Sequence, residues 1–227
     1  MPRRTLMLSL LLVTFATAVH SQSQAPLDAA RRADAYAVYS QLIKDLTNDG
    51  SYLIQDTTVS ASMGFGDPMR PTSAPGLDGA PASPNLARIQ CPVQPPADGA
   101  TTFQEILADY AQRKDTPALL AREFTLDKPY ELVNAETAKK FLQDALAASP
   151  QFGPAVPNSN PLAQKAGRLI RLGNVYFDKQ GNLAVTYVSV LTTTVDATGE
   201  WRVFRKVSPG NWLLDRSWRT CGWGSAR

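Results

Sequence analysis

Residues 168–193 read RLIRLGNVYFDKQGNLAVTYVSVLTT, and this stretch decides the fold. Two runs rich in β-branched and aromatic residues flank DKQGN at 178–182, which is typical of a tight turn. Two further strand-like runs, 200–207 and 211–220, flank SPGN at 208–211. Short connections make neighbouring strands antiparallel. We therefore expect a C-terminal antiparallel meander of about four strands.

Helical patterns precede these strands. Residues 27–47 predict a helix because apolar side chains recur at three- and four-residue spacing, as Tyr36, Tyr39, Leu42, Ile43 and Leu46. Residues 102–113 predict a second helix, which begins with a capping box formed by Thr102 and Glu105.

Shorter patterns complete the expected fold. A short helix is predicted over 117–124, because Pro117 suits a first helical position, and Asn134 caps a helix to about residue 148. Residues 51–58, SYLIQDTT, predict a strand, and 130–133 a short extended piece. Helices followed by strands indicate an α+β domain, which we expect to span 22–227 with its helices packed on the sheet.

The N-terminus has the pattern of a secretory signal peptide. Arg3 and Arg4 precede an apolar run at 6–19, and Ala16-Thr17-Ala18 has the small residues that a signal peptidase accepts. An uncleaved anchor is the alternative, but the run is shorter than the roughly 20 residues of a spanning helix. We expect cleavage after a signal peptide at 1–21, a periplasmic or secreted protein, and no integral membrane segment after cleavage.

The two cysteines are expected to be paired. Residues 59–99 are rich in proline and glycine and show no periodicity, which predicts an irregular loop. A loop of this length is unusual in a compact domain, and Cys91 lies within it. An exported chain with 2 Cys is expected to oxidise them. We therefore predict a disulfide between Cys91 and Cys221 that ties this loop to the end of the sheet.

Histidine chemistry is excluded from the folded body. The single histidine, His20, lies at the expected cleavage point. Ser-His-Asp and Cys-His catalysis and histidine-ligated metals are then ruled out. The sequence also has no phosphate-binding, dinucleotide-binding or nucleophile-elbow motif. We expect no metal and no cofactor.

Two acidic positions have both a functional and a structural interpretation. Asp56 could be a general acid or base with a raised pKa, or could accept hydrogen bonds from nearby backbone and threonine hydroxyls. We favour the second, because no partner carboxylate can be placed beside it. Asp178, Gln180 and Asn182 resemble half of a calcium loop, but no glutamate completes it, so a hairpin turn around Gly181 is expected.

The basic and aromatic residues are concentrated near the C-terminus. The last 60 residues carry a net positive charge, the rest of the mature chain is net acidic, and all 4 Trp lie between 201 and 223. Basic and aromatic residues together can bind nucleic acid. The charge is spread over both faces of the expected sheet, however, and inward packing of tryptophan explains the pattern. We expect no nucleic-acid partner.

The last hairpin supplies the one candidate ligand site. With its tip at Pro209-Gly210, one face carries Arg205 and Arg216 among apolar residues, and this face should meet the helices. The two arginines would lie diagonally, near enough to bind one anionic small molecule. Alternatively, they pair with a helix carboxylate such as Asp45, Glu105 or Asp109. In a different register, they would face solvent.

Five stretches form a pattern: DAYAVYS at 34–40, IQDTT at 54–58, LGNVYF at 172–177, AVTYV at 184–188 and CGW at 221–223. This pattern resembles a family of uncharacterised, predicted secreted bacterial proteins, and the resemblance implies export and a fold but no activity. The order of helices followed by an antiparallel meander with a tryptophan hairpin is similar to NTF2-like domains. Many of those hold a ligand pocket between a helix and a curved sheet.

These observations predict an exported, cofactor-free binding or structural module rather than an enzyme. The alternative is a small-molecule enzyme or ligand-binding protein of NTF2-like shape that uses Asp, Tyr or Arg. A deep pocket lined by Asp56 or by a tyrosine pair would favour the enzyme, and a filled interior would favour the module.

Overall fold

The computed structural model describes residues 27–46, 51–60, 93–147, 167–192, 197–220 and 222–224. The expected signal peptide at 1–21 and most of the stretch 59–99 lie outside these residues. In chain order the elements are α1 (Ala29–Asp45), β1 (Tyr52–Gln55), α2 (Ala100–Arg113), β2 (Tyr130–Val133), α3 (Ala135–Ala147), β3 (Arg168–Leu172), β4 (Tyr176–Phe177), β5 (Leu183–Thr192), β6 (Ala197–Ser208), β7 (Asn211–Leu214) and β8 (Gly222–Gly224). No helix in this part of the chain is long and apolar enough to cross a membrane.

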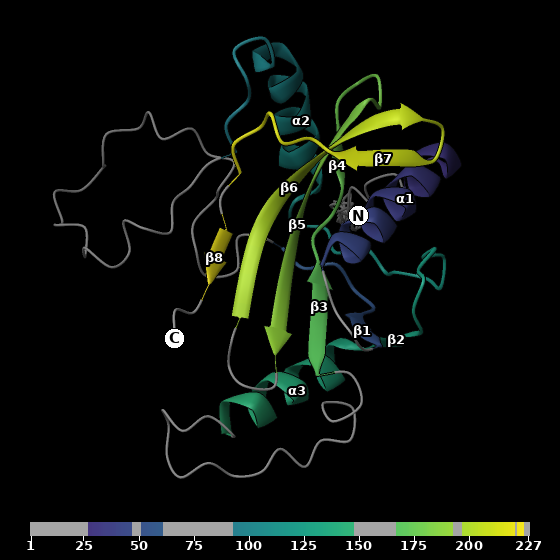
Figure 1. Ribbon diagram of the computed structural model, residues 1–227, viewed down its shortest axis with the longest axis vertical. Coiled ribbons are helices and arrows are strands. Elements are labelled where there is room, and N and C mark those ends of the chain that lie inside the picture. The colour runs from purple at the N-terminus through teal and green to yellow at the C-terminus, as the bar shows by residue number, and fades with distance from the viewer. Residues whose placement is uncertain are drawn as a thin grey trace, which may run out of the picture.

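The strands form one mixed sheet in the order β2-β1-β3-β5-β6-β7, with β4 also beside β5 and β8 beside β6 (Figure 1). The pairs β2-β1 and β1-β3 are parallel, and the other pairs are antiparallel. The α+β class is confirmed. The purely antiparallel C-terminal sheet of about four strands, with all helices before it, is wrong. The segments at 52–55 and 130–133 add two parallel strands, and both lie between helices along the chain.

Helices cover both faces of the sheet. On central β5, Ala184 and Val188 pack in the cluster that contains α1, whereas Val185 and Tyr187 pack in the cluster that contains α2. Leu191 joins the cluster of α3, on the same face as α2. A strand that is buried on both faces reads as a nearly continuous apolar run, and β5 has that pattern.

The helix predictions were partly right. Helix α1 lies where the pattern placed it, and the Asn134 side chain caps α3 by accepting from the Thr137 amide at 2.8 Å. The capping box at Thr102 is wrong, because Gly99 is the N-cap of α2. The helix at 117–124 is also wrong. The Leu120 amide instead donates to the Asp56 carbonyl at 2.6 Å, so this segment bonds to the chain beyond β1.

The β6–β7 hairpin differs from the expected register by one residue. Arg205 pairs with Leu213, because a bulge at Val207 shifts the pairing between Lys206 and Ser208. A shift by one residue moves every side chain to the other face. The expectation that Arg205 and Arg216 face the helices is therefore wrong: both are exposed.

Arg205 already has a partner on its own hairpin. Its Nη2 lies 2.8 Å from Oδ2 of Asp215. Burial alone would raise the pKa of Asp215, but hydrogen bonds from Ser217 and Arg205 outweigh it and lower the pKa. Anion binding by Arg205 and Arg216 stays a prediction, but it no longer has the packed face on which it was based.

The helix-facing side of this hairpin carries a lysine instead. Lys206 Nζ lies 2.7 Å from Asp34 Oδ2 on α1, and Trp212 Nε1 donates to Asp34 Oδ1 at 3.3 Å. The Asp34 and Lys206 side chains are 14% and 24% exposed. This network joins the first helix to the last hairpin.

Replacing Asp34 with Ala should lower the free energy of unfolding by about 2–3 kcal/mol, because it leaves a partly buried ammonium and an indole N–H without their acceptor. Urea unfolding followed by tryptophan fluorescence measures the change. Lys140→Ala is the matched control. It removes the exposed Lys140–Asp144 pair and should cost less than about 0.5 kcal/mol. Equal losses in the two variants would contradict the role given to Asp34.

Cys91 and Cys221 lie outside the described residues, and the disulfide between them stays a prediction. Among the described residues, Gln94 and Arg219 exchange two backbone hydrogen bonds of 2.9 and 3.1 Å, so these two segments are paired there. Protein purified from an oxidising compartment should show no thiol that reacts with a thiol reagent in denaturant. Reduction should cost at most about 4–5 kcal/mol of stability. Two reactive thiols would refute the pairing.

Candidate functional site

The site begins at an interruption between β3 and β4. Leu172 pairs with Val188 and Tyr176 with Val185, so three residues of one strand oppose two of its partner, which is a β-bulge. Gly173 fits here because a Cβ atom would lie 3.0 Å from Cβ of Tyr187. The bulge leaves the Asn174 side chain buried beside the strand.

Asn174 holds a loop against this bulge. Its Nδ2 donates to the carbonyls of Arg113 and Thr116, both at 2.9 Å, and its Oδ1 accepts from the Thr58 hydroxyl at 2.8 Å. The Thr58 hydroxyl also accepts from the Ala118 amide at 2.7 Å. Because buried and fully bonded networks are rigid, residues 113–118 have a fixed position over the bulge.

An ion pair from α2 completes the outer edge of β4. Asp109 Oδ2 accepts from the Phe177 amide at 2.8 Å, and an Arg113 Nη group donates to the Val175 carbonyl. The two side chains also bind each other, with Arg113 Nε 2.6 Å from Asp109 Oδ1. Backbone groups that a neighbouring strand would normally satisfy are thus satisfied by side chains.

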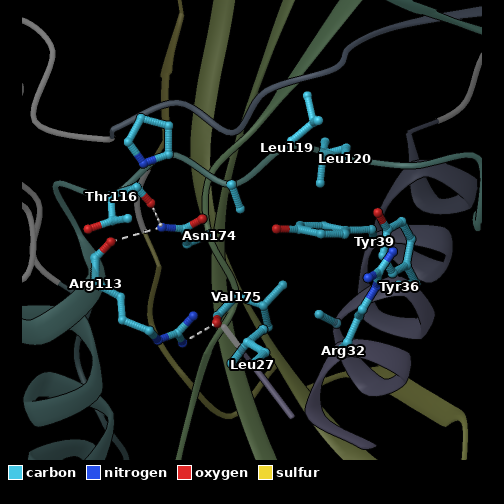
Figure 2. A pocket seen from close by; sticks show the side chains of 13 residues that line it. Leu27, Arg32, Tyr36, Tyr39, Arg113, Thr116, Leu119, Leu120, Asn174 and Val175 are labelled. Carbon is cyan, nitrogen blue, oxygen red and sulfur yellow. Dashed lines mark hydrogen bonds between the residues drawn. The ribbon is translucent and has the colours of Figure 1, made fainter. Parts of the chain in front are cut away.

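A pocket of about 360 Å³ lies between α1, residues 113–120 and the bulge (Figure 2). Tyr36 and Tyr39 of α1 form one wall, and Figure 2 shows the Tyr39 ring pointing across the pocket toward Asn174 and Val175. Most of the lining is apolar. Leu119, which is 79% exposed, also lines it.

The charged groups of the pocket are already compensated. Arg113 is paired with Asp109, and Arg32 is paired with Glu123, with 3.2 Å between Arg32 Nε and Glu123 Oε2. The hydrogen bonds that Arg32 donates to the Glu123 carboxylate raise the pKa of Arg32. Both arginines are therefore bound to carboxylates of the protein itself.

The two tyrosines differ in their hydrogen bonds. Tyr39 donates to the Gly173 carbonyl at 2.9 Å, and burial raises the pKa of its phenol. The Tyr36 oxygen accepts from the Ala121 amide at 2.6 Å, and no described group accepts the proton of Tyr36 itself. The pocket thus presents one phenolic donor that a ligand can use.

The other candidate residues lie elsewhere. Asp56 does not line the pocket, and its Oδ1 accepts from the Thr57 hydroxyl at 2.9 Å, as its structural interpretation predicted.

Residues 178–182 form the expected turn, with Gly181 at φ 70° and Asp178 Oδ1 accepting from the amides of Asn182 and Leu183. The described ranges contain no group of three or more His, Cys, Asp or Glu side chains placed to hold a metal ion.

In the sequence the pocket tyrosines stand out only as residues of the apolar helix face. The signal for the site itself is Gly173-Asn174 inside an otherwise apolar strand, since a glycine in such a run indicates a bulge or a close backbone approach. A polar amide beside it needs buried partners, which here come from the loop that forms the pocket.

No family model, curated protein or solved structure matches this chain. The resemblance to secreted bacterial proteins and the similarity to NTF2-like domains therefore stay predictions. Two stretches that carry the first resemblance, 34–40 and 172–177, supply opposite walls of the pocket.

Alkaline pH should destabilise the protein through Tyr39 and Tyr176, whose pKa values are both raised by burial. Above about pH 10 the unfolded phenols lose protons that the folded ones keep, so stability falls as pH rises. Each phenol contributes a slope of about 1.4 kcal/mol per pH unit. Tyr39→Phe should remove one such contribution, while costing about 1 kcal/mol at neutral pH. Urea unfolding between pH 9 and 11.5 measures this, and an unchanged slope would contradict it.

Proposed function

We propose that this chain is an exported binding module that takes a small, neutral, largely apolar molecule into the pocket between α1 and residues 113–120. The observation that carries the proposal is a pocket that is mostly apolar and contains no uncompensated charge. Its volume of about 360 Å³ lies at the lower end of the range for small-molecule sites.

Compensated charges select against ionic ligands. A carboxylate ligand would have to displace Asp109 from Arg113 or Glu123 from Arg32, and Asp109 also caps the Phe177 amide. A neutral ligand avoids that cost. A carbonyl or ether oxygen on the ligand could accept the Tyr36 proton, while its apolar part contacts Leu120 and Val175.

The tyrosine pair in the pocket meets the condition set for the enzyme, but its chemistry supports binding. A general base must be able to lose its proton near working pH, whereas burial raises the pKa of the Tyr39 phenol. Asp109 and Glu123, the carboxylates beside the pocket, are each bound to an arginine. The Tyr39 hydroxyl also donates to a backbone carbonyl, as a structural group does.

The neutral fluorophore N-phenyl-1-naphthylamine is a suitable first probe, because it is apolar and small. We expect saturable 1:1 binding, seen as increased fluorescence. Ala118→Trp should weaken binding at least tenfold, because it fills the pocket from an exposed loop position without removing a core side chain. Ala111→Trp, on the exposed side of α2 and outside the pocket, is the matched control and should bind as the wild type does.

Two results would contradict this function. The first is a wild-type protein that does not bind the probe saturably. The second is equal binding by the wild type and the Ala118→Trp variant, since the probe would then occupy another surface. Tyr36→Phe gives a further test, because it should leave apolar probes unaffected and weaken ligands that carry an acceptor oxygen by about 3–10-fold.

A further inference from the structure

The opposite face of the sheet carries a row of polar residues between two apolar clusters. This polar row consists of Gln55 on β1, Arg171 on β3 and Ser189 on β5, and Gly199 on β6 occupies the next position without a side chain. Arg171 pairs directly with Ser189 across the sheet, and Ser189 pairs with Gly199. Gln55 joins the row through its Oε1, which accepts from Arg171 Nε at 3.1 Å.

The surroundings of the polar row are apolar on both sides along the strands. Leu169 and Leu191 pack in the cluster of α3, whereas Tyr187 and Trp201 pack in the cluster of α2. Side chains at alternate positions share a face, so the polar row lies between these clusters, on the face away from α1. An ionic contact there is weakly screened.

Arg171 has no anionic partner in the part of the chain that the structure describes. Its one hydrogen bond among the described residues is the one to Gln55, which is neutral, so both of its Nη groups remain available. The side chain is half-buried, and desolvation lowers the pKa of its guanidinium. A charge withdrawn from water without a counter-charge costs free energy, which an incoming anion would recover.

Ser189 supplies a second unused donor. It is 4% exposed, and its hydroxyl has no hydrogen-bond partner among the described residues. The hydroxyl is therefore available to a ligand that also reaches the Arg171 guanidinium. Directly opposite positions on neighbouring strands place their Cβ atoms about 5 Å apart, so both donors can reach one ligand. Gly199 adds no side chain at the next position of the row.

We propose that the polar row binds a small oxyanion, a carboxylate or a phosphate group, through the Arg171 guanidinium and the Ser189 hydroxyl. The fork of two Nη donors matches two oxygens of either anion. The site is separate from the pocket of the proposed function, which lies on the α1 face and holds only compensated arginines. It also differs from the pair Arg205 and Arg216, which are exposed on the last hairpin.

The test measures thermal unfolding of the full mature protein with sodium phosphate or sodium acetate, each against sodium chloride at equal ionic strength. The wild type should show a saturable rise in Tm with at least one of the two anions. Arg171→Gln should weaken the apparent affinity at least tenfold. Arg171→Lys should recover only part of it, because an ammonium lacks the fork. A response to phosphate alone assigns a phosphate ligand, and a response to acetate alone assigns a carboxylate.

Two further variants keep the test decisive. Ser189→Ala removes one donor from a position that already lacks a partner, so it should fold and bind the anion several-fold more weakly. Arg216→Gln, on the exposed hairpin, should bind as the wild type does. The proposal is overturned if neither anion raises the wild-type Tm beyond chloride, if Arg171→Gln and Ser189→Ala both respond as the wild type does, or if Arg216→Gln alone abolishes the response.

Discussion

The buried amide of Asn174 is the contact on which the pocket depends. It lies in the three-residue interruption between β3 and β4 and bonds to β1's continuation at Thr58 and to the loop that follows α2. A regular strand there would direct the side chain into one of the two packed faces of the sheet. The bulge instead gives the amide three polar partners, so its burial costs little. The same interruption exposes the Gly173 carbonyl to the Tyr39 hydroxyl, which fixes the opposite wall.

The completion of the β4 edge follows from this bulge. Strand β1 pairs with β3 but not with β4, so among the described residues the backbone of β4 has a strand on one side only. Arg113 bonds to the Val175 carbonyl and Asp109 to the Phe177 amide, which are backbone groups on the open side of β4. These bonds place the end of α2 beside the pocket. The loop at 113–120 then passes the sheet edge, where Leu119 forms an isolated bridge with Thr57. Fold and pocket therefore share the same hydrogen bonds.

Local patterns predicted the parts of this fold that depend on neighbours in sequence. The helix at 29–45, the Asn134 cap and the turn around Gly181 each follow from residues a few positions apart. The parallel pairing of β1 with β2 and β3 could not be predicted, because it joins segments far apart in the chain and a four-residue strand carries little register information. The register of the last hairpin failed for another reason. The bulge at Val207 leaves no signature in a turn that reads SPGN.

The described arginines differ in the groups that they bind. Four arginines contact a carboxylate: Arg32, Arg113, Arg202 and Arg205. Arg31 instead donates to the backbone carbonyls of Asp178 and Lys179. Around the pocket this pairing leaves polar groups that suit a neutral ligand. Arg171 instead has a neutral amide beside it and a hydroxyl opposite it, in a position where a glutamate or aspartate would fit the strand register. Among the described half-buried arginines, Arg113 and Arg202 are paired with acids and Arg31 with carbonyls, whereas Arg171 has only a neutral amide, which is the charge balance of a site awaiting an anion.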